Sequence, residues 1–200
     1  MRCRSVLIVG SLLLAVSLAG CATPRAGAAA GAPTDAGAPT DAAAPTPTPE
    51  LTETLDAEAA AARAKAQAWL DAANLPPGTA PTDLRFGFMS YTGWPCGPVE
   101  ELSGYWTIPD MTVVDATNWI REHPTADLIT TSLGPPSDDM VIESTIVGYI
   151  PAPGAQEGIV YTLAKSGNDV AVRAEVAALT ASAVCPPLPD GGQYGAPGQG

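Results

Sequence analysis

The stretch "GIVYTLAKSGNDVAVRAEVAAL", residues 158–179, decides the fold class. Two runs rich in β-branched residues flank Gly167-Asn168, a pair typical of the two-residue turn of a β-hairpin. In the second run the apolar side chains alternate with Arg173 and Glu175, so the two groups occupy opposite faces of the strand. The apolar group comprises Val170, Val172, Ala174 and Val176. This pattern predicts antiparallel strands with one face buried and the other in solvent.

The rest of the domain predicts two helices and further strands. Helices are expected over residues 52–75 and 112–124, the second with Thr112 or Asp110 at its start. The apolar stripe of the first helix is thin before Trp69, which predicts loose docking of its front half. Further strands are expected over residues 83–90, 104–109 and 139–150. The sequence therefore predicts an α+β fold: a mostly antiparallel sheet with two helices packed on it, in a single domain over residues 52–188.

An export signal is expected over residues 1–20. Arg2 and Arg4 precede an apolar run that is far shorter than the roughly 20 residues of a membrane-spanning helix. The sequence "LAGC" (18–21) resembles the lipobox of bacterial lipoproteins, which implies cleavage before Cys21 and a diacylglycerol thioether on its sulfur. Because two acyl chains suffice for stable anchoring, we expect a lipid-anchored protein on the extracytoplasmic side of the cell membrane. The alternative is an ordinary cleaved signal followed by an incidental cysteine.

Two segments of low complexity flank the domain. Residues 22–49 consist almost wholly of Ala, Pro, Thr and Gly and contain no large apolar side chain. Such a chain cannot bury enough surface to offset the entropy of ordering, so a disordered tether is expected over residues 21–51. Its threonines are either sites for O-linked sugars or part of an unmodified spacer. A second disordered segment is expected over residues 189–200.

Charge and cysteine count limit the partners and the compartment. The full sequence has 9 basic and 21 acidic residues, and two of the arginines leave with the signal. The mature chain then has 7 basic residues and a net charge of 7 − 21 = −14. This charge argues against a nucleic-acid partner. Because Cys3 leaves with the signal and Cys21 carries the lipid, Cys96 and Cys185 remain, and two thiols in an exported protein predict one disulfide.

The sequence contains no recognisable set of catalytic or metal-binding residues. The motif "GWPCGP" (93–98) has the letters of a thioredoxin-type redox site but no second cysteine beside Cys96, which favours a structural bridge. The single histidine, His123, ends a predicted helix, and neither a G-x-S-x-G motif nor a metal-ligand spacing occurs. We therefore expect no catalytic residue, metal or cofactor, although a carboxylate pair for glycoside hydrolysis stays open.

A cluster of aromatic residues is the best candidate for a ligand site. Six aromatic side chains fall within residues 86–106, and aromatic rings near acids and amides stack on sugars or hold apolar ligands. Trp94, Tyr105 and Trp106 are the candidate ligand-binding residues. The competing interpretation is that these rings belong to the core, because each removes a large area from water. Trp94 is the best candidate for a surface role because it lies in a Gly/Pro loop.

Three motifs are similar to those of a group of secreted proteins and lipoproteins from actinobacteria. They are "NLPPGT" (74–79), "YWTIP" (105–109) and "WIREHPTADL" (119–128). The resemblance covers residues 69–179 and implies export and the domain boundaries. Because that group is uncharacterised, the resemblance implies no catalytic or binding residues.

These observations favour a non-enzymatic binding or scaffolding module of the cell envelope. Its membrane contact would run through the lipid on Cys21, and its partner would be an envelope protein, lipid or glycan. Two alternatives stay open. One is a carrier with an apolar cavity for a lipid or another apolar envelope metabolite, and the other is a carboxylate-based enzyme that acts on envelope glycans.

Overall fold

The computed structural model describes residues 49–83, 91–132, 134 and 141–199. The chain divides into two units, Met1–Ala44 and Pro45–Gly200, and all of the described residues lie in the second unit. The predicted signal, Cys21 and nearly all of the predicted tether therefore lie outside the described residues. So does nearly all of the strand predicted over residues 83–90.

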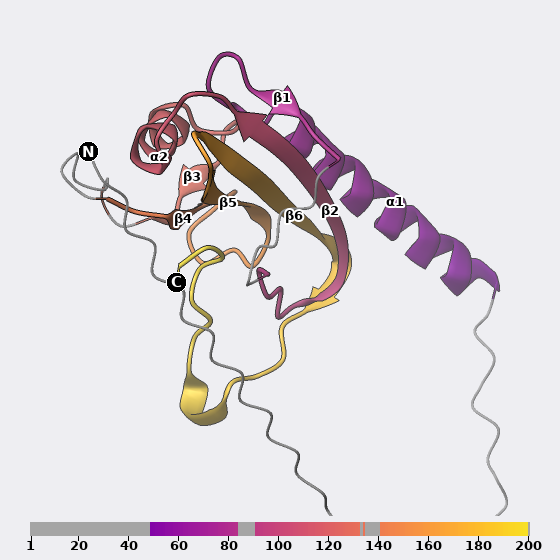
Figure 1. Ribbon diagram of the computed structural model, residues 1–200. Helices are drawn as coiled ribbons and strands as arrows, with labels where there is room; N and C mark the ends of the chain where they lie inside the picture. Colours follow the sequence, from indigo (N-terminus) through magenta and orange to yellow (C-terminus); the bar gives the residue numbers. More distant parts are fainter. Residues whose placement is uncertain (1–48, 84–90, 133, 135–140, 200) are drawn as a thin grey trace, which may run out of the picture. The chain divides into compact units, whose positions relative to one another are not determined.

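The strands of the described residues form one antiparallel sheet (Figure 1). Their order is β1-β2-β6-β5-β4-β3, and two α-helices pack on this sheet. The elements are α1 (Pro49–Asp71), β1 (Ala80–Pro81), β2 (Gly97–Ile108), α2 (Val113–Glu122), β3 (Ile129–Thr130), β4 (Ser144–Ile150), β5 (Gly158–Ser166), β6 (Asp169–Val184) and a 3-10 turn (Pro189–Gly191). The predicted α+β fold is confirmed.

The hairpin predicted from residues 158–179 forms the centre of the sheet. Strands β5 and β6 pair from Ser166↔Asp169 onward and are joined by the predicted turn at Gly167-Asn168. Gly167 has φ of 67°, a left-handed conformation that glycine adopts without steric cost. The other edge of β6 pairs with β2. Strand β6 therefore contributes side chains to the middle of both faces of the sheet.

The two helices cover one face of the sheet, which we call the helix face. Helix α1 contacts β2 and β6, and α2 contacts β4 and β5 (Figure 1). The core between the helices and this face consists of apolar side chains from both layers. Its fully buried members include Ile108, Ile120, Val147, Ile159, Leu163, Val170, Val172 and Val176.

Helix α2 has the predicted ends. Thr112 caps its start, because the Thr112 side chain accepts a hydrogen bond from the Asp115 backbone N–H at 3.1 Å. His123 follows its last turn and stacks on Trp119, with 3.9 Å between the ring centroids. His123 therefore has the packing role expected of a lone histidine at a helix end.

Helix α1 begins slightly before the predicted residue 52, and only its second half is buried. Ala62 and Ala66 are 3% and 0% exposed, whereas Leu51 and Leu55 near its start are 53% and 45% exposed. The prediction of a loosely docked front half is confirmed.

The face of the sheet opposite the helices, which we call the loop face, is buried and not in solvent. Arg173 and Glu175 lie on this face and are only 1% and 7% exposed. The sequence pattern predicted a wet face here, and that prediction is wrong. Two segments without regular structure cover this face: residues 91–96, the Cys96 loop, and residues 192–199, the C-terminal segment.

Candidate functional site

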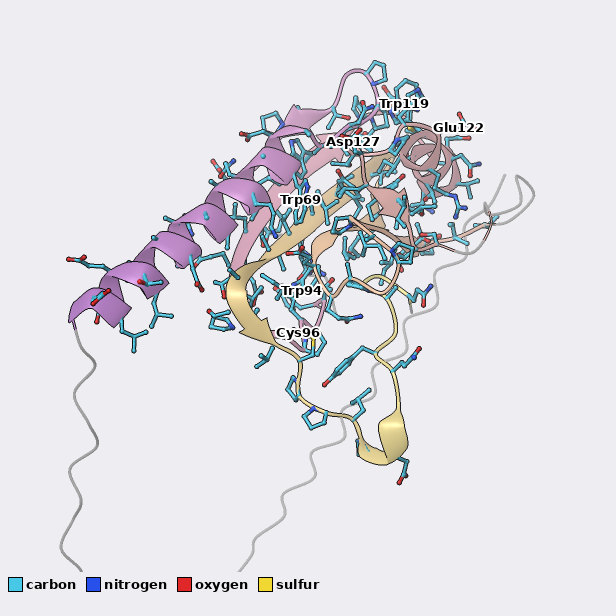
Figure 2. The ribbon with its side chains drawn as sticks, turned by 180° about the vertical axis from the view of Figure 1, so that it is seen from behind. Trp69, Trp94, Cys96, Trp119, Glu122 and Asp127 are labelled. Atoms are coloured by element: carbon cyan, nitrogen blue, oxygen red, sulfur yellow. A yellow bond between two sulfur atoms is a disulfide. The ribbon has the colours of Figure 1, made fainter. Side chains whose placement is uncertain are left out.

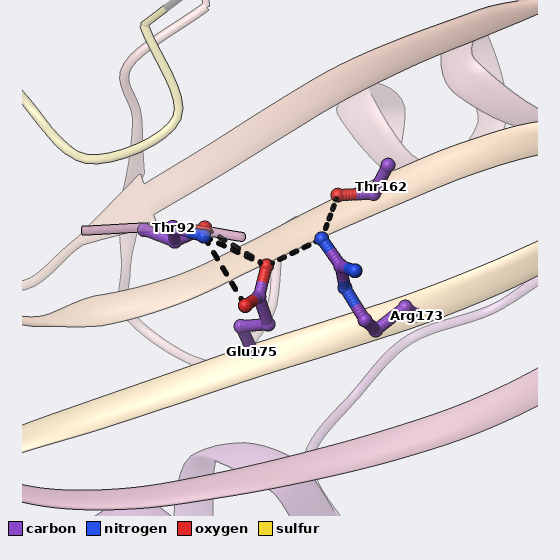
Figure 3. Close-up of polar contacts among 4 residues, drawn as sticks. All are labelled: Thr92, Thr162, Arg173 and Glu175. Atoms are coloured by element: carbon purple, nitrogen blue, oxygen red, sulfur yellow. Dashed lines mark hydrogen bonds and ion pairs between the residues drawn. The ribbon is translucent and has the colours of Figure 1, made fainter. Parts of the chain in front are cut away.

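A buried ion pair lies at the centre of the loop face (Figure 3). The Nη2 group of Arg173 donates to Glu175 Oε2 at 2.8 Å and to Thr162 Oγ1 at 3.3 Å. Arg173 and Glu175 are two residues apart on β6, so their side chains emerge on the same face, and Thr162 lies opposite Arg173 on β5. Because a charge taken out of water needs a partner, this pairing lets both groups stay buried.

The ion pair also holds the Cys96 loop. Glu175 accepts hydrogen bonds from the Thr92 backbone N–H at 3.2 Å and from Thr92 Oγ1 at 3.0 Å (Figure 3). The ring of Tyr91 lies over the guanidinium of Arg173, with 4.3 Å from Cζ to the ring centroid, while the Tyr91 side chain is 74% exposed. Glu175 and Arg173 on the sheet thus hold the Cys96 loop in place.

The predicted disulfide joins the Cys96 loop to the end of β6. Cys96 and Cys185 are bonded, with 4.1 Å between their Cα atoms, and they are 89 positions apart in the sequence. Cys96 is buried at 2% exposure. Figure 2 shows Trp94 beside Cys96, away from Trp69 on α1 and Trp119 on α2. The bridge is therefore a structural link, as the sequence predicted.

The C-terminal segment lies against the loop face. The Oγ1 group of Thr131 donates to the Pro197 carbonyl at 2.9 Å, and Gln199 Nε2 donates to the Thr131 carbonyl at 2.9 Å. Gly148 permits this close approach, because a Cβ atom on it would lie 2.3 Å from the Pro197 carbonyl oxygen. The prediction of disorder over residues 189–200 is therefore wrong for these residues, since polar side chains of the sheet satisfy the backbone of this Gly/Pro segment.

A groove lies between the Cys96 loop and the C-terminal segment. It has a volume of about 620 Å³, and it is open to solvent on one side. Aromatic rings, amide side chains and hydroxyl groups line it, with the ion pair's guanidinium at its floor. These groups belong to Tyr91, Trp94, Tyr194, Gln156, Gln199, Thr92, Thr162 and Arg173. The groove is the candidate functional site.

The polar groups of the groove are held in place by the fold. Gln156 is 8% exposed and donates through Nε2 to the Gly195 carbonyl at 3.3 Å. The hydroxyl of Tyr194 donates to the Pro186 carbonyl at 2.8 Å, which orients its ring. Because the charge of Arg173 is balanced by Glu175, the floor offers a neutral but polar surface.

The predicted ligand residues divide between the two faces. Trp94 lines the groove. Tyr105 lies on the loop face opposite Arg173 in the register, but it does not line the groove. Trp106 points to the helix face and packs against the core, over Gly104, where a Cβ atom would lie 2.2 Å from its ring. Of the three, Trp94 alone meets the expectation of a ligand-facing position.

Sequence reasoning missed most of the groove. Arg173, Thr162 and Gln156 were not among the candidates, and Tyr194 lies in the segment predicted to be disordered. One signal was available: Ala171 and Ala177 lie on the same face of β6 as Arg173 and Glu175, and small apolar residues there indicate a covered face rather than a solvated one.

A second hollow, also about 620 Å³, lies between the start of α2 and the β5–β6 turn. Its carboxylates are those of Asp110, Asp115, Glu143 and Asp169. Asp115 accepts from Thr112 Oγ1 at 2.6 Å, Asp169 accepts from the Asp110 backbone N–H at 3.2 Å, and Glu143 pairs with Lys165 at 3.1 Å. These three acids stabilise a helix cap, a turn and a hairpin.

The tyrosines with shifted pKa values belong to the helix face. Burial raises the pKa of Tyr149 to about 12, with a smaller opposing effect of the Arg121 charge. Burial also raises the pKa of Tyr161, and a hydrogen bond with Thr125 lowers it by a smaller amount. Both hydroxyls therefore stay protonated and act as hydrogen-bonding groups of the core, Tyr149 donating to the Ile120 carbonyl.

Two further findings concern only the described residues. Within these ranges, no cluster of three or more His, Cys, Asp or Glu side chains is arranged to hold a metal ion. No helix in the same ranges has the length and apolar character needed to span a membrane.

Comparison with known proteins adds no relative. No protein-family model, no curated protein and no solved structure matches this chain. The resemblance to secreted actinobacterial proteins and the lipobox therefore stay predictions from the sequence motifs.

Proposed function

We propose that this protein is a lipid-anchored binding module on the outer side of the cell membrane, and that its groove binds a neutral sugar unit of an envelope glycan. The observation that carries the proposal is the composition of the groove: three aromatic rings, from Tyr91, Trp94 and Tyr194, and two amide side chains around one opening. The anchor is the lipid expected on Cys21. The activity is binding without chemical conversion.

The groove fits a sugar because a sugar ring has two kinds of surface. Its C–H faces are apolar and stack on aromatic rings, while its hydroxyl groups need donors and acceptors at the edge. Tyr91 and Trp94 lie on the Cys96 loop. Gln156 and Gln199 donate through Nε2 to backbone carbonyls of the protein, which leaves their Oε1 atoms as acceptors for sugar hydroxyls. Few polar groups placed among aromatic ones are typical of ligand sites.

The fixed floor of the groove favours affinity. Glu175 holds the backbone of Thr92, and the disulfide holds Cys96, so Trp94 between them needs little ordering when a ligand binds. Tyr91, next to Thr92, packs on the Arg173 guanidinium. A site that is ordered in advance loses less entropy on binding. The buried ion pair is thus a support for the site, and Arg173 and Glu175 are positioning residues.

The proposal is tested with the full chain carrying Cys21→Ser, which prevents lipidation. Neutral tetrasaccharides of N-acetylglucosamine and of mannose serve as probes, and binding is followed by NMR shift perturbation. We expect perturbed signals confined to the residues that line the groove, which are residues 91–95 and 194–199 together with Ile146, Gln156, Thr162 and Arg173, for at least one probe. Tyr91→Ala and Trp94→Ala should weaken that binding at least tenfold, whereas Tyr91→Phe should keep most of it because the ring remains.

Three outcomes would overturn the proposal. One is that neither probe binds, and another is that perturbations fall outside the groove. The third is a different activity of the same protein: an acyl lipid that copurifies in the groove would establish the carrier alternative, and cleavage of the oligosaccharides would establish the enzyme alternative. Tyr91→Ala is expected to leave folding intact because Tyr91 is 74% exposed.

A further inference from the structure

The front half of α1 carries an apolar face that the sheet does not cover. In Figures 1 and 2 the first turns of α1 project past β2 and β6. Leu51 and Leu55 lie four residues apart, in phase with Ala62 and Ala66, so the stripe that is buried in the second half continues into solvent. The two leucines are 53% and 45% exposed, which is uncommon for paired leucines on one helix face.

A groove, which we call the α1 groove, lies beside this stripe; Ala62 of the stripe lines it, whereas Leu51 and Leu55 do not. It has a volume of about 560 Å³ and lies between α1 and the end of β6. Ala57 and Ala61 form its helix wall, and Leu179 and Ala181 form its strand wall. The alanines Ala57, Ala61 and Ala181 leave room for a large apolar side chain of a partner beside Leu179. Glu58 closes one end by accepting hydrogen bonds from the backbone N–H and the hydroxyl of Ser182.

The charge around the α1 groove is acidic. Residues 50–58 contain four acids, Glu50, Glu53, Asp56 and Glu58, and no lysine or arginine. Lys65, which lines the α1 groove, pairs with Glu157 at 2.7 Å, and Arg63 on the same helix pairs with Glu100 at 3.4 Å. Acidic side chains near the start of a helix interact favourably with the helix dipole, which explains their negative charge. The dipole does not explain the exposed leucines. A partner for this surface must therefore be basic as well as apolar.

We propose that residues 50–58 and the α1 groove form a docking site for a basic amphipathic segment of another envelope protein. Its apolar side chains would fill the space between Ala57, Ala61 and Ala181, and its lysines or arginines would face the acids of α1. This mode of recognition places an apolar face in a groove and uses the flanking charges for specificity.

Charge and composition exclude the other occupants. A second copy would place the four acids of residues 50–58 against the same four acids, and like charges at short range repel. The chain's own residues 22–49 contain no large apolar side chain to fill the α1 groove. An anionic membrane surface would repel the acids in the same way.

The experiment uses the full chain with Cys21→Ser and a synthetic 14-residue helical peptide with leucines four residues apart and lysines elsewhere. Binding is measured by calorimetry. Ala57→Gln with Ala61→Gln fills the α1 groove without changing charge and keeps good helix formers. Ala60→Gln with Ala64→Gln makes the same change at two exposed positions that do not line the α1 groove and is the matched control.

We expect the groove variant to weaken peptide binding at least tenfold and the control variant to leave it unchanged. A peptide with glutamates in place of lysines should not bind. Circular dichroism verifies that both variants keep the helix. The proposal is overturned if the two variants behave alike, or if a lysine peptide without leucines binds as tightly, since the contact would then be charge alone. A dimer of the chain that the groove variant abolishes would assign the site to a second copy instead. The saccharide test uses different residues, so either proposal can fail without the other.

Discussion

The two faces of the sheet are buried by different means. The helix face is filled by branched aliphatic side chains, whereas the loop face buries Arg173, Glu175 and Thr162. The difference follows from what covers each face. A helix satisfies its own backbone, so it can pack through apolar side chains, but an irregular segment brings backbone N–H and C=O groups that need partners. Glu175 accepts a hydrogen bond from the Thr92 N–H, and Thr131 donates one to the Pro197 carbonyl. Polar side chains are therefore needed on this face because the segments that cover it have no regular secondary structure.

The disulfide gives the strongest test of how the covering segments are held on the loop face. The double variant Cys96→Ala/Cys185→Ala should lower the free energy of unfolding by about 4–5 kcal/mol in the chain-entropy model for a loop of this length. Urea denaturation measures the change. The reduced wild-type chain is the control and should match the variant. A loss below about 1 kcal/mol would show that the loop face is held without the bridge.

The buried ion pair gives the next effect. Glu175→Ala leaves the Arg173 guanidinium buried without its carboxylate and should cost about 3–5 kcal/mol. The double variant Arg173→Met/Glu175→Leu removes both charges and should recover most of that stability. It should still increase amide exchange in residues 91–95, because the Thr92 N–H loses its acceptor. Equal stability of the single and double variants in urea denaturation would contradict this account.

Gly148 gives a smaller effect on the same face. A Cβ atom at this position would meet the Pro197 carbonyl and Thr131 Oγ1, so Gly148→Ala should displace the C-terminal segment and cost about 1–3 kcal/mol. Hydrogen exchange of residues 195–199 measures the displacement. Gly195→Ala is the control, since nothing lies within 4 Å of its added Cβ. Similar exchange in both variants would mean that Gly148 does not hold the segment.

The helix face gives the smallest effect, in alkaline solution. Burial places the folded-state pKa of Tyr149 at about 12, above the unfolded value of 10. The unfolded chain therefore loses this proton first, so the stabilising contribution is complete below pH 10 and falls as the pH rises toward 12. We expect a loss on the order of 1 kcal/mol by pH 11, measured by urea denaturation. Tyr149→Phe should flatten this slope, and an unchanged slope would exclude Tyr149 as its source.

The elements that form the helix face were predicted well, because the patterns that indicate them involve residues close together in the sequence. Alternation in residues 170–176, the turn at Gly167-Asn168 and the cap at Thr112 all depend on near neighbours in the chain. The disulfide was also predicted by counting, since Cys96 and Cys185 are the two cysteines outside the expected signal and lipidation site. These features need no knowledge of what lies across the sheet.

The loop face could not be predicted in the same way. Arg173 and Glu175 have the alternation of a solvated face, and nothing in β6 says that residues 91–96 and 192–199 return to cover it. Gly/Pro composition gives no periodicity, so the C-terminal segment was indistinguishable from a disordered tail. The groove exists only where these distant segments meet, which explains why Trp94 was found and Gln156 and Tyr194 were missed.

The position of α1 also has a mechanical consequence. A force applied to the chain before Pro49 enters the domain through this helix, which lies outside the covalent loop closed by Cys96 and Cys185. Because its front half has little buried surface, residues 49–60 should peel from the sheet first under load, while Ala62 and Ala66 hold the second half in the core. These twelve residues span about 18 Å as a helix and about 40 Å when extended. The domain would then lengthen by about 20 Å while the cross-linked body stays closed, so the front half of α1 can act as an extensible spacer that limits the force reaching the rest of the fold.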